Sequence, residues 1–595
     1  GLVSFDNTTS GKYAVESWSW DFGDPDSGDD NVSELESTGH FYSEPGNVSI
    51  MLTASTDYGC VAVLTMDTVL ADQPEADFTL LNDCFIKGEN TLFLDNSISA
   101  FADIDHLTWT FKTKSGGVLG TIESDSSAEV IEFPFTSLDQ YQVSLSVTNE
   151  VGCSGDVTLP IDLRPVRNLR YSSYYEDFNG QATGWEALSA DAQSSWLRDE
   201  PDFFGFQPEV GDLAWYTDLP AQSEGFVEQS WVQSPCFNLK GMSAPVIQLD
   251  LMKSFVPAMD GAVLQYQELS NSEWITIGAR EEGLNWYNQS EIQNRPGGSS
   301  FGWGLETFEP DTGWINAGHS LDMLVDKPFV KFRIALGTGG GQVLGNQGFA
   351  FDNIFIGQRI RRSVLEHFTN AASVAAAEAD QVVQAFAEEH SAIMYDLHYH
   401  MDYPGADPMN FNNPDPPKIR AFGNGVSSVP YAILNGGNGD GYRYDFTNSS
   451  EEPDAEALIE ASLEIPLFQV NTTVNYLEDS LKGNVVVTCA TDTFTHNLQL
   501  YIAVIEREVT AYTGVNGVTS FRNVVLDMLP APTGKLLGNA WGRGSADTLD
   551  FEWEYPPYVE DVEDLSVVAF VLDRDIDHIL QADAKPHTPG VGISE

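Results

Sequence analysis

The sequence predicts a mainly β, multidomain protein built of β-sandwiches, with one α/β domain in its C-terminal half. The chain has 595 residues, which at the usual domain size corresponds to about three to six domains. Short segments that alternate apolar and polar residues, such as 47–56 and 141–150, are separated by turns rich in Gly, Asp and Ser. The only long helical pattern is the alanine-rich segment 371–390, where apolar residues recur at helical spacing.

The charge of the chain is strongly negative, with 28 basic against 89 acidic residues and a net charge of -61. Such a field repels nucleic acids and anionic membranes, so we exclude both as partners. The sequence contains no apolar run of about 18 residues, so we expect no direct membrane insertion. Carboxylate-rich loops suit Ca²⁺, but solubility in a salty medium explains the charge as a whole better.

The first two domains are expected at 1–73 and 74–163. The stretches "SWSWDFGDPDSGDD" and "GHFYSEPGNVSIML" resemble the polycystic-kidney-disease (PKD) repeat, an immunoglobulin-like sandwich. The residues that carry this resemblance are Trp20, Asp21, Phe22, Gly23, Asp24, His40, Tyr42, Pro45 and Gly46. The second copy is degenerate, because "LTWTFKT" keeps Trp109 and Phe111 but lacks the Gly-Asp turn.

Five cysteines are spread along the chain, and none are closely spaced as in a zinc or haem motif. Cys84 lies near the start of the second domain and Cys153 near its end, so we expect a disulfide between them. The first domain has only Cys60, whose partner we expect before Gly1 in a longer protein, and the alternative is a buried free thiol. No pairing is predicted for Cys236 or Cys489.

A long β-rich domain is expected at 171–358, after a linker at 162–170. Its opening "YYEDFNGQATGW" and its closing strands resemble the jelly-roll modules of MAM and cleaved-adhesin type. In such modules the first and last strands are neighbours and often hold a structural Ca²⁺. The resemblance implies Glu176, Asp177 and Asp352 as ligands, and ordinary strand-edge acids are the alternative.

Four tryptophans in this domain offer two interpretations. They could form a sugar-stacking face or pack in the core, and core packing is favoured. The residues are Trp215, Trp231, Trp286 and Trp303.

Residues 359–447 change in character and show the order strand, helix, strand, helix, strand of a thioredoxin fold. The dipeptide Val429-Pro430 lies where that fold has a cis-proline. His398 and His400 lie two residues apart on a predicted strand and could bind a metal with Asp396 or Asp402. We favour packed, hydrogen-bonded histidines instead.

This domain and a β-sandwich expected at 448–588 resemble one family, the thioredoxin-like outer-membrane or surface proteins of Bacteroidetes. The segments "VLEHFTN", "LHYHMDYPGADPMNFNNP" and "GVSSVPYAILNGG" carry the resemblance. Members commonly have Cys-x-x-Cys after Phe-Thr-Asn, where this chain has Ser373 and Ala376. Disulfide exchange needs a thiolate and a resolving thiol. The resemblance therefore implies a retained fold, with Pro430 in place, and no oxidoreductase activity or redox cofactor.

The order of domains resembles that of cargo of the type IX secretion system of Bacteroidetes. No G-x-S-x-G, H-E-x-x-H or P-loop motif is present, so we expect no enzyme. We expect a structural and adhesive segment of an extracellular, cell-surface protein, such as a modular stalk, a gliding adhesin or a contact appendage. Its partners would be copies or neighbouring domains of the same assembly, glycans or surface proteins. The alternatives are a carbohydrate-binding accessory region of a secreted enzyme and a self-assembly module of an extracellular filament.

Overall fold

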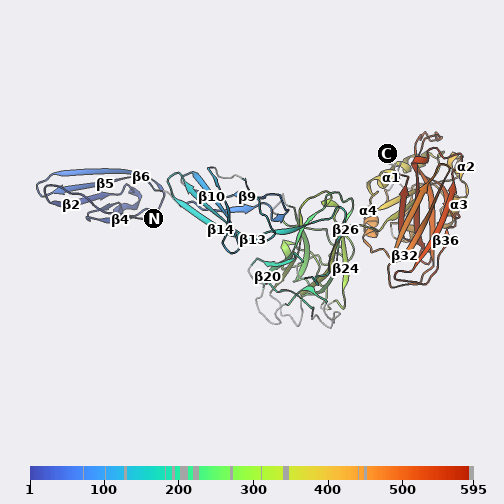
Figure 1. The fold of residues 1–595 in the computed structure, drawn as a ribbon, viewed down its shortest axis with the longest axis horizontal. Coiled ribbons are helices and arrows are strands. Elements are labelled where there is room, and N and C mark those ends of the chain that lie inside the picture. The colour runs from blue at the N-terminus through green and yellow to red at the C-terminus, as the bar shows by residue number, and fades with distance from the viewer. Residues whose placement is uncertain are drawn as a thin grey trace. The chain divides into compact units, whose positions relative to one another are not determined.

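The computed structural model has a mainly β, multidomain architecture, as predicted (Figure 1). The chain forms two compact units, of which the first holds Gly1–Arg167 and the second holds most of the remaining chain. None of the described helices is long and apolar enough to cross a bilayer. The structure describes residues 1–70, 73–100, 102–125, 130–180, 183–190, 194–201, 212–218, 227–268, 273–307, 309, 311–339, 348–439, 441–447 and 452–587.

The first sandwich has two sheets, with strand orders β3-β2-β5-β6 and β1-β4. Trp20 on β2 and Phe22, which directly follows that strand, are 6% and 1% exposed, which confirms the predicted buried face. Gly23 has φ +69, and a Cβ there would lie 2.5 Å from the carbonyl oxygen of Ser49, so this turn requires glycine. The strands are β1 (Leu2–Phe5), β2 (Val15–Asp21), β3 (Val32–Ser33), β4 (Thr38–Phe41), β5 (Gly46–Thr56) and β6 (Val61–Leu70), with a 3₁₀ turn at Pro25–Asn31.

The second sandwich repeats this plan, with strand orders β11-β10-β13-β14 and β12-β9-β7. Trp109 and Phe111, which the degenerate repeat keeps, are fully buried in its core. The strands are β7 (Phe78–Leu80), β8 (Cys84–Phe85), β9 (Thr91–Asp95), β10 (Ile104–Thr113), β11 (Val118–Ser124), β12 (Val130–Phe133), β13 (Gln140–Asn149), β14 (Ser154–Asp162) and β15 (Arg164–Asn168).

The predicted Cys84–Cys153 disulfide is wrong. Cys84 and Cys236 are disulfide-bonded cysteines, whereas Cys153 keeps its thiol. Cys153 directly precedes β14, while Cys84 pairs with Arg164, which lies just beyond the other end of that strand. A strand of this length spans about 30 Å, whereas the Cα atoms of a disulfide lie within about 7 Å of each other.

Two further cysteines keep their thiols. Cys60 is exposed directly before β6, and Cys489 is buried at the end of β32. The Cys489 thiol donates to the carbonyl oxygen of Thr491 at 3.2 Å. A partner for Cys60 before Gly1 stays a prediction.

The jelly-roll region contains the sheet β18-β19-β26-β21-β24 and the run β23-β22-β25-β20. The first strand, β16, pairs with the last, β26, as the resemblance implied. The strands are β16 (Tyr174–Glu176), β17 (Glu186–Ser189), β18 (Trp196–Asp199), β19 (Ala214–Thr217), β20 (Val227–Asn238), β21 (Pro245–Ser254), β22 (Gly261–Glu268), β23 (Ile275–Thr276), β24 (Ile315–Ser320), β25 (Val330–Gly339) and β26 (Gly348–Gln358), with 3₁₀ turns at Pro296–Gly298 and Asp322–Leu324.

An α/β layer follows, and the predicted order of strand, helix, strand, helix, strand is confirmed. Strands β27 and β28 are parallel, β29 is antiparallel to β27, and β30 is antiparallel to β29. The elements are β27 (Ser363–Thr369), α1 (Val374–Glu389), β28 (Met394–His400), α2 (Pro408–Asn412), α3 (Asp415–Gly423), β29 (Tyr431–Leu434), β30 (Arg443–Asp445) and α4 (Ala455–Leu463), with a 3₁₀ turn at Asn435–Gly437.

The last region is a sandwich whose larger sheet continues that of the α/β layer, in the order β30-β29-β27-β28-β35-β34-β39-β40. The junction is a parallel contact of His398 with Val524. The second sheet is β31-β32-β38. The strands are β31 (Phe468–Tyr476), β32 (Ser480–Cys489), β33 (Thr493–Phe494), β34 (Leu498–Val509), β35 (Phe521–Leu529), β36 (Lys535–Leu536), β37 (Trp541–Gly542), β38 (Ala546–Glu554), β39 (Leu565–Asp573) and β40 (His578–Pro586), with a 3₁₀ turn at Val562–Asp564.

Helix α4 follows the expected boundary at 447/448 but packs with the α/β layer. Its Leu458 is buried in one core with Leu365 of β27, Ala432 of β29 and Phe446. The α/β layer therefore extends to the end of α4, and it shares its sheet with the sandwich that follows.

Candidate functional site

The two positions at which the resemblance places cysteines form the N-terminal cap of α1. Ser373 is the N-cap residue, and its Oγ accepts a hydrogen bond from the Ala376 N–H at 3.2 Å. Ser373 is 8% exposed and Ala376 is fully buried. A serine cap stabilises a helix by about 1 kcal/mol. The pair thus has a structural role, and neither side chain carries a thiol.

The loop between β34 and β35 lies directly against this cap. The Asn516 N–H donates to the Ala371 carbonyl at 3.3 Å, and the Asn516 side-chain amide donates to the Ser373 carbonyl at 3.0 Å. A Cβ on Gly514 would lie 2.6 Å from the Ala371 oxygen, so only glycine allows this approach. Segments about 140 residues apart in the sequence are therefore fixed together at the start of α1.

The proline expected beside this position is present with the expected isomer. The Val429–Pro430 peptide bond is cis. Phe368 on β27 pairs with Tyr431 on β29, which places Pro430 beside the end of β27. The positions that the sequence predicted, Ser373, Ala376 and Pro430, therefore lie on the segments that meet at this end of the α/β layer.

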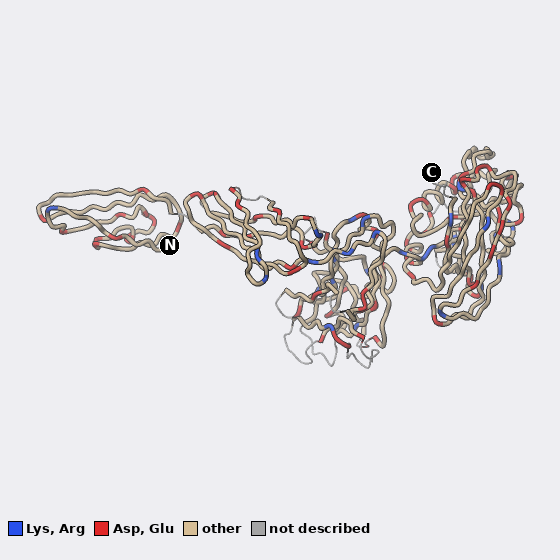
Figure 2. Tube along the Cα trace, viewed as in Figure 1, with Lys and Arg blue, Asp and Glu red and all other residues tan. Residues whose placement is uncertain are grey.

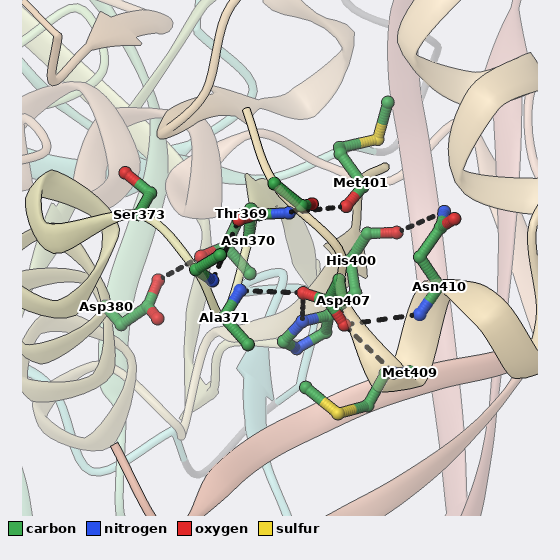
Figure 3. Close-up of polar contacts among 12 residues, drawn as sticks. Thr369, Asn370, Ala371, Ser373, Asp380, His400, Met401, Asp407, Met409 and Asn410 are labelled. Carbon is green, nitrogen blue, oxygen red and sulfur yellow. Dashed lines mark hydrogen bonds and ion pairs between the residues drawn. The ribbon is translucent and has the colours of Figure 1, made fainter. Parts of the chain in front are cut away.

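A buried carboxylate, which the sequence interpretation did not single out, organises the same end of the layer (Figure 3). Asp407 accepts hydrogen bonds from the Ala371 N–H at 2.7 Å and from His400 Nδ1 at 2.8 Å. Its other oxygen accepts from the N–H groups of Met409 and Asn410 and so caps α2. Burial alone would raise the pKa of Asp407, but the hydrogen bond from His400 and the backbone donors lower it. The Asp-Pro pair at 407–408 is the sequence signal for such a cap.

A second carboxylate, on α1, connects the helix to β27. Asp380 Oδ1 accepts from Thr369 Oγ1 at 2.6 Å and contacts His367 Nε2 at 2.7 Å. Burial lowers the pKa of His367, although Asp380 opposes the shift. Burial would raise the pKa of Asp380, but its bond with His367 lowers it below the ordinary value. The pair is therefore a neutral imidazole on a charged carboxylate.

The prediction that His398 and His400 are packed and hydrogen-bonded is confirmed. His398 Nε2 lies 3.0 Å from Asp396, and His400 contacts Asp407, while both rings are almost fully buried. Asp402, the other candidate ligand, is exposed. In the described chain neither histidine belongs to a group of three mutually close metal-ligating side chains.

One such group that the sequence interpretation missed lies in the C-terminal sandwich: His496, Asp573 and Asp575. His496 Nδ1 lies 2.7 Å from Asp573, and Asp575 accepts from the N–H and side-chain amide of Asn497. The hydrogen bond that His496 donates to Asp573 raises the pKa of His496. These hydrogen bonds give the cluster a structural role, because they hold residues 496–497 against the end of β39.

Four aspartates gather around the β16–β26–β21 edge of the jelly roll. Asp250 and Asp352 lie directly opposite each other in the register of β21 and β26. Burial raises the pKa of Asp352 to about 7, and the charges of Asp212, Asp250 and Asp177 add to this effect against a hydrogen bond from the Asn353 N–H. Like charges opposite each other in a sheet are destabilising. Carboxylates are the ligands that a hard cation prefers, but in the described chain no three of these four aspartates bring their oxygens within 4.8 Å of one another.

The sequence predicted part of this cluster. Asp177 and Asp352 belong to it, and Asp212 and Asp250 were missed because their approach depends on strand pairing. Glu176 serves another role, since its carboxylate accepts from the Tyr174 hydroxyl at 3.1 Å and from the Phe178 N–H at 3.1 Å.

Core packing of the four tryptophans is confirmed. Trp215, Trp286 and Trp303 are buried, at 8%, 3% and 1% exposure. Trp231 is partly buried against the same core and lies under the Arg333 guanidinium, 4.6 Å from the ring centre. These residues therefore do not form the sugar-stacking surface.

Acidic residues occur along the whole trace, whereas Lys and Arg are sparse (Figure 2). A field of this kind favours cationic ligands and disfavours anionic ones in every domain. The aspartate cluster is thus a local concentration within a generally acidic chain.

No protein-family model matches the sequence, and no curated protein matches it. Among solved structures, HBP35 of Porphyromonas gingivalis is 15% identical and matches over 40% of this chain and 80% of its own, with a TM-score of 0.31. The K1 cleaved adhesin domain of Lys-gingipain from P. gingivalis W83 is 11% identical over 31% of this chain and 97% of its own, with a TM-score of 0.19. A carbohydrate-binding module of the β-sandwich superfamily is 16% identical over 48% of this chain and 98% of its own, with a TM-score of 0.20. Likenesses this weak support no functional inference, which must come from the residues.

Proposed function

We propose that this chain is a non-enzymatic, adhesive segment of a secreted cell-surface protein, in which β-sandwich modules carry binding surfaces outside the cell. The observation that supports this is the former redox position. Ser373 and Ala376 cap a helix there, and the backbone around Asn516 packs against them. A thioredoxin-like layer that lacks the thiols would serve as a structural scaffold. It shares one continuous sheet with the sandwich that follows, which fits that role.

Adhesion is tested with beads coated with the full chain. The surfaces tested are other cells and cells of the species that makes this protein. On at least one of them we expect the coated beads to adhere about tenfold more than control beads, because many weak contacts add through multivalency. The control beads carry an unrelated acidic protein of similar charge, so that charge alone is matched. Equal adherence of both bead types on every surface tested would reject the adhesive function.

The aspartate cluster of the jelly roll is the proposed Ca²⁺ site. Asp177, Asp212, Asp250 and Asp352 carry oxygen ligands of the kind that Ca²⁺ prefers, and Ca²⁺ binding would have to draw them together, because no three of these described carboxylates lie within 4.8 Å of one another. The charges with the largest effect on the pKa of Asp352 are those of Asp212, Asp250 and Asp177, and they add to the effect of burial. A bound Ca²⁺ would neutralise these carboxylates and stiffen the edge where β16 meets β26.

The pH dependence of stability tests this site. Asp352 has a folded pKa of about 7 against an ordinary 3.8, so its stabilising contribution is complete below 3.8 and is lost as the pH rises through 7. In chelator, we expect the free energy of unfolding to fall by about 2 kcal/mol over this range, after allowance for solvent screening. Added Ca²⁺ should abolish most of the fall, because it binds the charged form. Urea unfolding at a series of pH values measures the effect.

The matched variants are Asp352→Asn, which should remove the fall, and Asp199→Asn, which changes an exposed acid on β18 and should leave it unchanged. The Ca²⁺ site is rejected if the wild-type and Asp352→Asn chains show the same pH profile with and without Ca²⁺.

The two alternatives have separate tests. Discrete sugar specificity on a glycan array would favour a carbohydrate-binding accessory region. Concentration-dependent oligomers in light scattering would favour a self-assembly module.

A further inference from the structure

A groove of about 440 Å³ lies on the outer face of the jelly-roll sheet, next to the segment that follows α4. Ile247, Leu249 and Leu251 of β21 point into the core and are at most 1% exposed. Alternation along the strand therefore places Gln248 and Asp250 on the opposite face, where both line the groove. We call this feature the β21 groove.

Two aromatic rings form the floor of the β21 groove. Tyr175 on β16 and Phe355 on β26 are cross-strand partners, and Gln248 pairs with Phe355 from the other side. Tyr175 is 60% exposed, so its ring face is available to a ligand. Ile360 and Ile465, at 61% and 57% exposure, add apolar surface to the walls.

The polar wall presents hydrogen-bond acceptors. Asp250 receives one bond each from the side-chain amides of Asn316 at 2.9 Å and Asn353 at 3.0 Å, which leaves carboxylate lone pairs unused. The Tyr175 hydroxyl donates to Asn353 Oδ1. The Gln248 side-chain amide donates to the backbone carbonyl of Leu463. The Asn316 Oδ1 atom is buried and has no partner in the described chain. A ligand rich in donors would satisfy the unused lone pairs of Asp250.

The electrostatic field in the β21 groove is negative. Asp250 lines the groove and lies directly opposite Asp352 in the register of β21 and β26, so two carboxylates lie together at this wall. The two charged neighbours on the opposite wall are already paired: Arg359 binds Asp322 and the Ser462 hydroxyl, and Glu464 binds Arg361. Arg359 is the cation among the described residues that line the groove, and its ion pair with Asp322 offsets its charge.

We propose that the β21 groove binds an arginine side chain presented by a basic segment of a partner protein. A guanidinium is planar, stacks on aromatic rings, offers five donors and is weakly hydrated. Ca²⁺ and a guanidinium would compete for Asp250, but only the guanidinium also gains from the aromatic floor and the isoleucines. A neutral sugar would gain nothing from the negative field. A second copy of this chain is disfavoured as the partner, because each copy carries a net charge of -61.

The test measures binding of a labelled Gly-Gly-Arg-Gly-Gly peptide to the full chain in chelator, by fluorescence anisotropy, against its citrulline and lysine counterparts. We expect the arginine peptide to bind about tenfold more tightly than the neutral citrulline peptide and more tightly than the lysine peptide. Equal binding of the arginine and citrulline peptides would overturn the proposal, as would binding of neutral methyl glycosides at the same site.

Two groove variants and two matched controls locate the site. Asp250→Asn and Tyr175→Ala should each weaken arginine binding about five- to tenfold, while thermal melts verify that both variants fold. Asp199→Asn and Tyr171→Ala change an exposed acid and an 87% exposed tyrosine outside the groove lining and should leave binding unchanged. If the control Asp199→Asn weakens binding as much as Asp250→Asn, the general acidic field is responsible and the groove is rejected.

The proposed adhesive function gives arginine binding its biological purpose, and this inference rests on it in that respect alone. The two proposals can be rejected independently. A chain that discriminates arginine from citrulline but does not adhere supports the groove and rejects the adhesive function. A chain that adheres without this discrimination does the reverse.

Discussion

Replacing Arg420 by methionine is expected to lower the free energy of unfolding of the second unit by about 3–5 kcal/mol. Arg420 Nε and NH2 bind the two oxygens of Glu366 at 2.9 and 2.6 Å, and Glu366 on β27 is fully buried. Burial opposes the charge of Arg420, but Glu366 more than compensates and raises the pKa of the guanidinium. The variant would leave the Glu366 carboxylate buried without its cation. Urea or guanidinium unfolding followed by tryptophan fluorescence measures the loss.

The same guanidinium connects the α/β layer to the last sandwich, since it lies 4.3 Å from the ring centre of Tyr501 on β34. The double variant Glu366→Gln with Arg420→Met should recover part of the lost free energy of unfolding, because it also removes the buried, unpaired charge of Glu366. Arg280→Met is the matched control: its partner Glu281 is exposed, and we expect a change below about 1 kcal/mol. A loss in Arg420→Met no larger than in this control would show that the buried pair does not stabilise the fold.

The sequence predicted the α/β layer well because its signals are local. The alanine-rich segment has a serine cap and helical spacing, and the structure has α1 at Val374–Glu389. Val429-Pro430 adopts the predicted cis form. Burial of Trp20 and Trp109 likewise follows from alternation along one strand.

Features that depend on pairing between distant strands were not predicted. The partner of Cys84 could not be inferred from positions near the start and end of a domain, because the length of β14 separates Cys84 from Cys153. Asp250 joins the aspartate cluster only through the register of β21 with β26, in which it lies opposite Asp352. Spacing in one sequence does not contain this register, which is set by the sheet as a whole.

The polar network around Asp407 shows an intermediate case. The Asp-Pro pair gives a local signal for a helix start, and the cap on α2 is its direct consequence. The bonds to Ala371 and His400 come from β27 and β28 and are visible only in the folded sheet. The same carboxylate therefore has one contact that the sequence indicates, the cap of α2, and one that the sequence does not indicate, the bond to the segment after β27.

Replacing Asp407 by alanine is expected to lower the free energy of unfolding by about 4 kcal/mol, because each buried donor left without an acceptor costs about 1–3 kcal/mol. The donors are the N–H groups of Ala371, Met409 and Asn410 together with His400. Asp407→Asn keeps a side-chain oxygen and should lose about half as much. Asp402→Ala, at an exposed acid nearby, should change stability by less than about 0.5 kcal/mol.

The effect also has a direction in pH. The folded pKa of Asp407 lies below its ordinary 3.8, so its contribution is complete above that value and is lost as the pH falls through the lower folded pKa. The difference in stability between the wild type and Asp407→Ala should therefore shrink in acid. Hydrogen exchange at the amide of Ala371 provides a second measurement, since its acceptor is the Asp407 carboxylate. A variant that keeps both wild-type stability and slow exchange at this amide would show that the strand end before Ser373 is held by other contacts. The capped start of α1 would then not depend on Asp407.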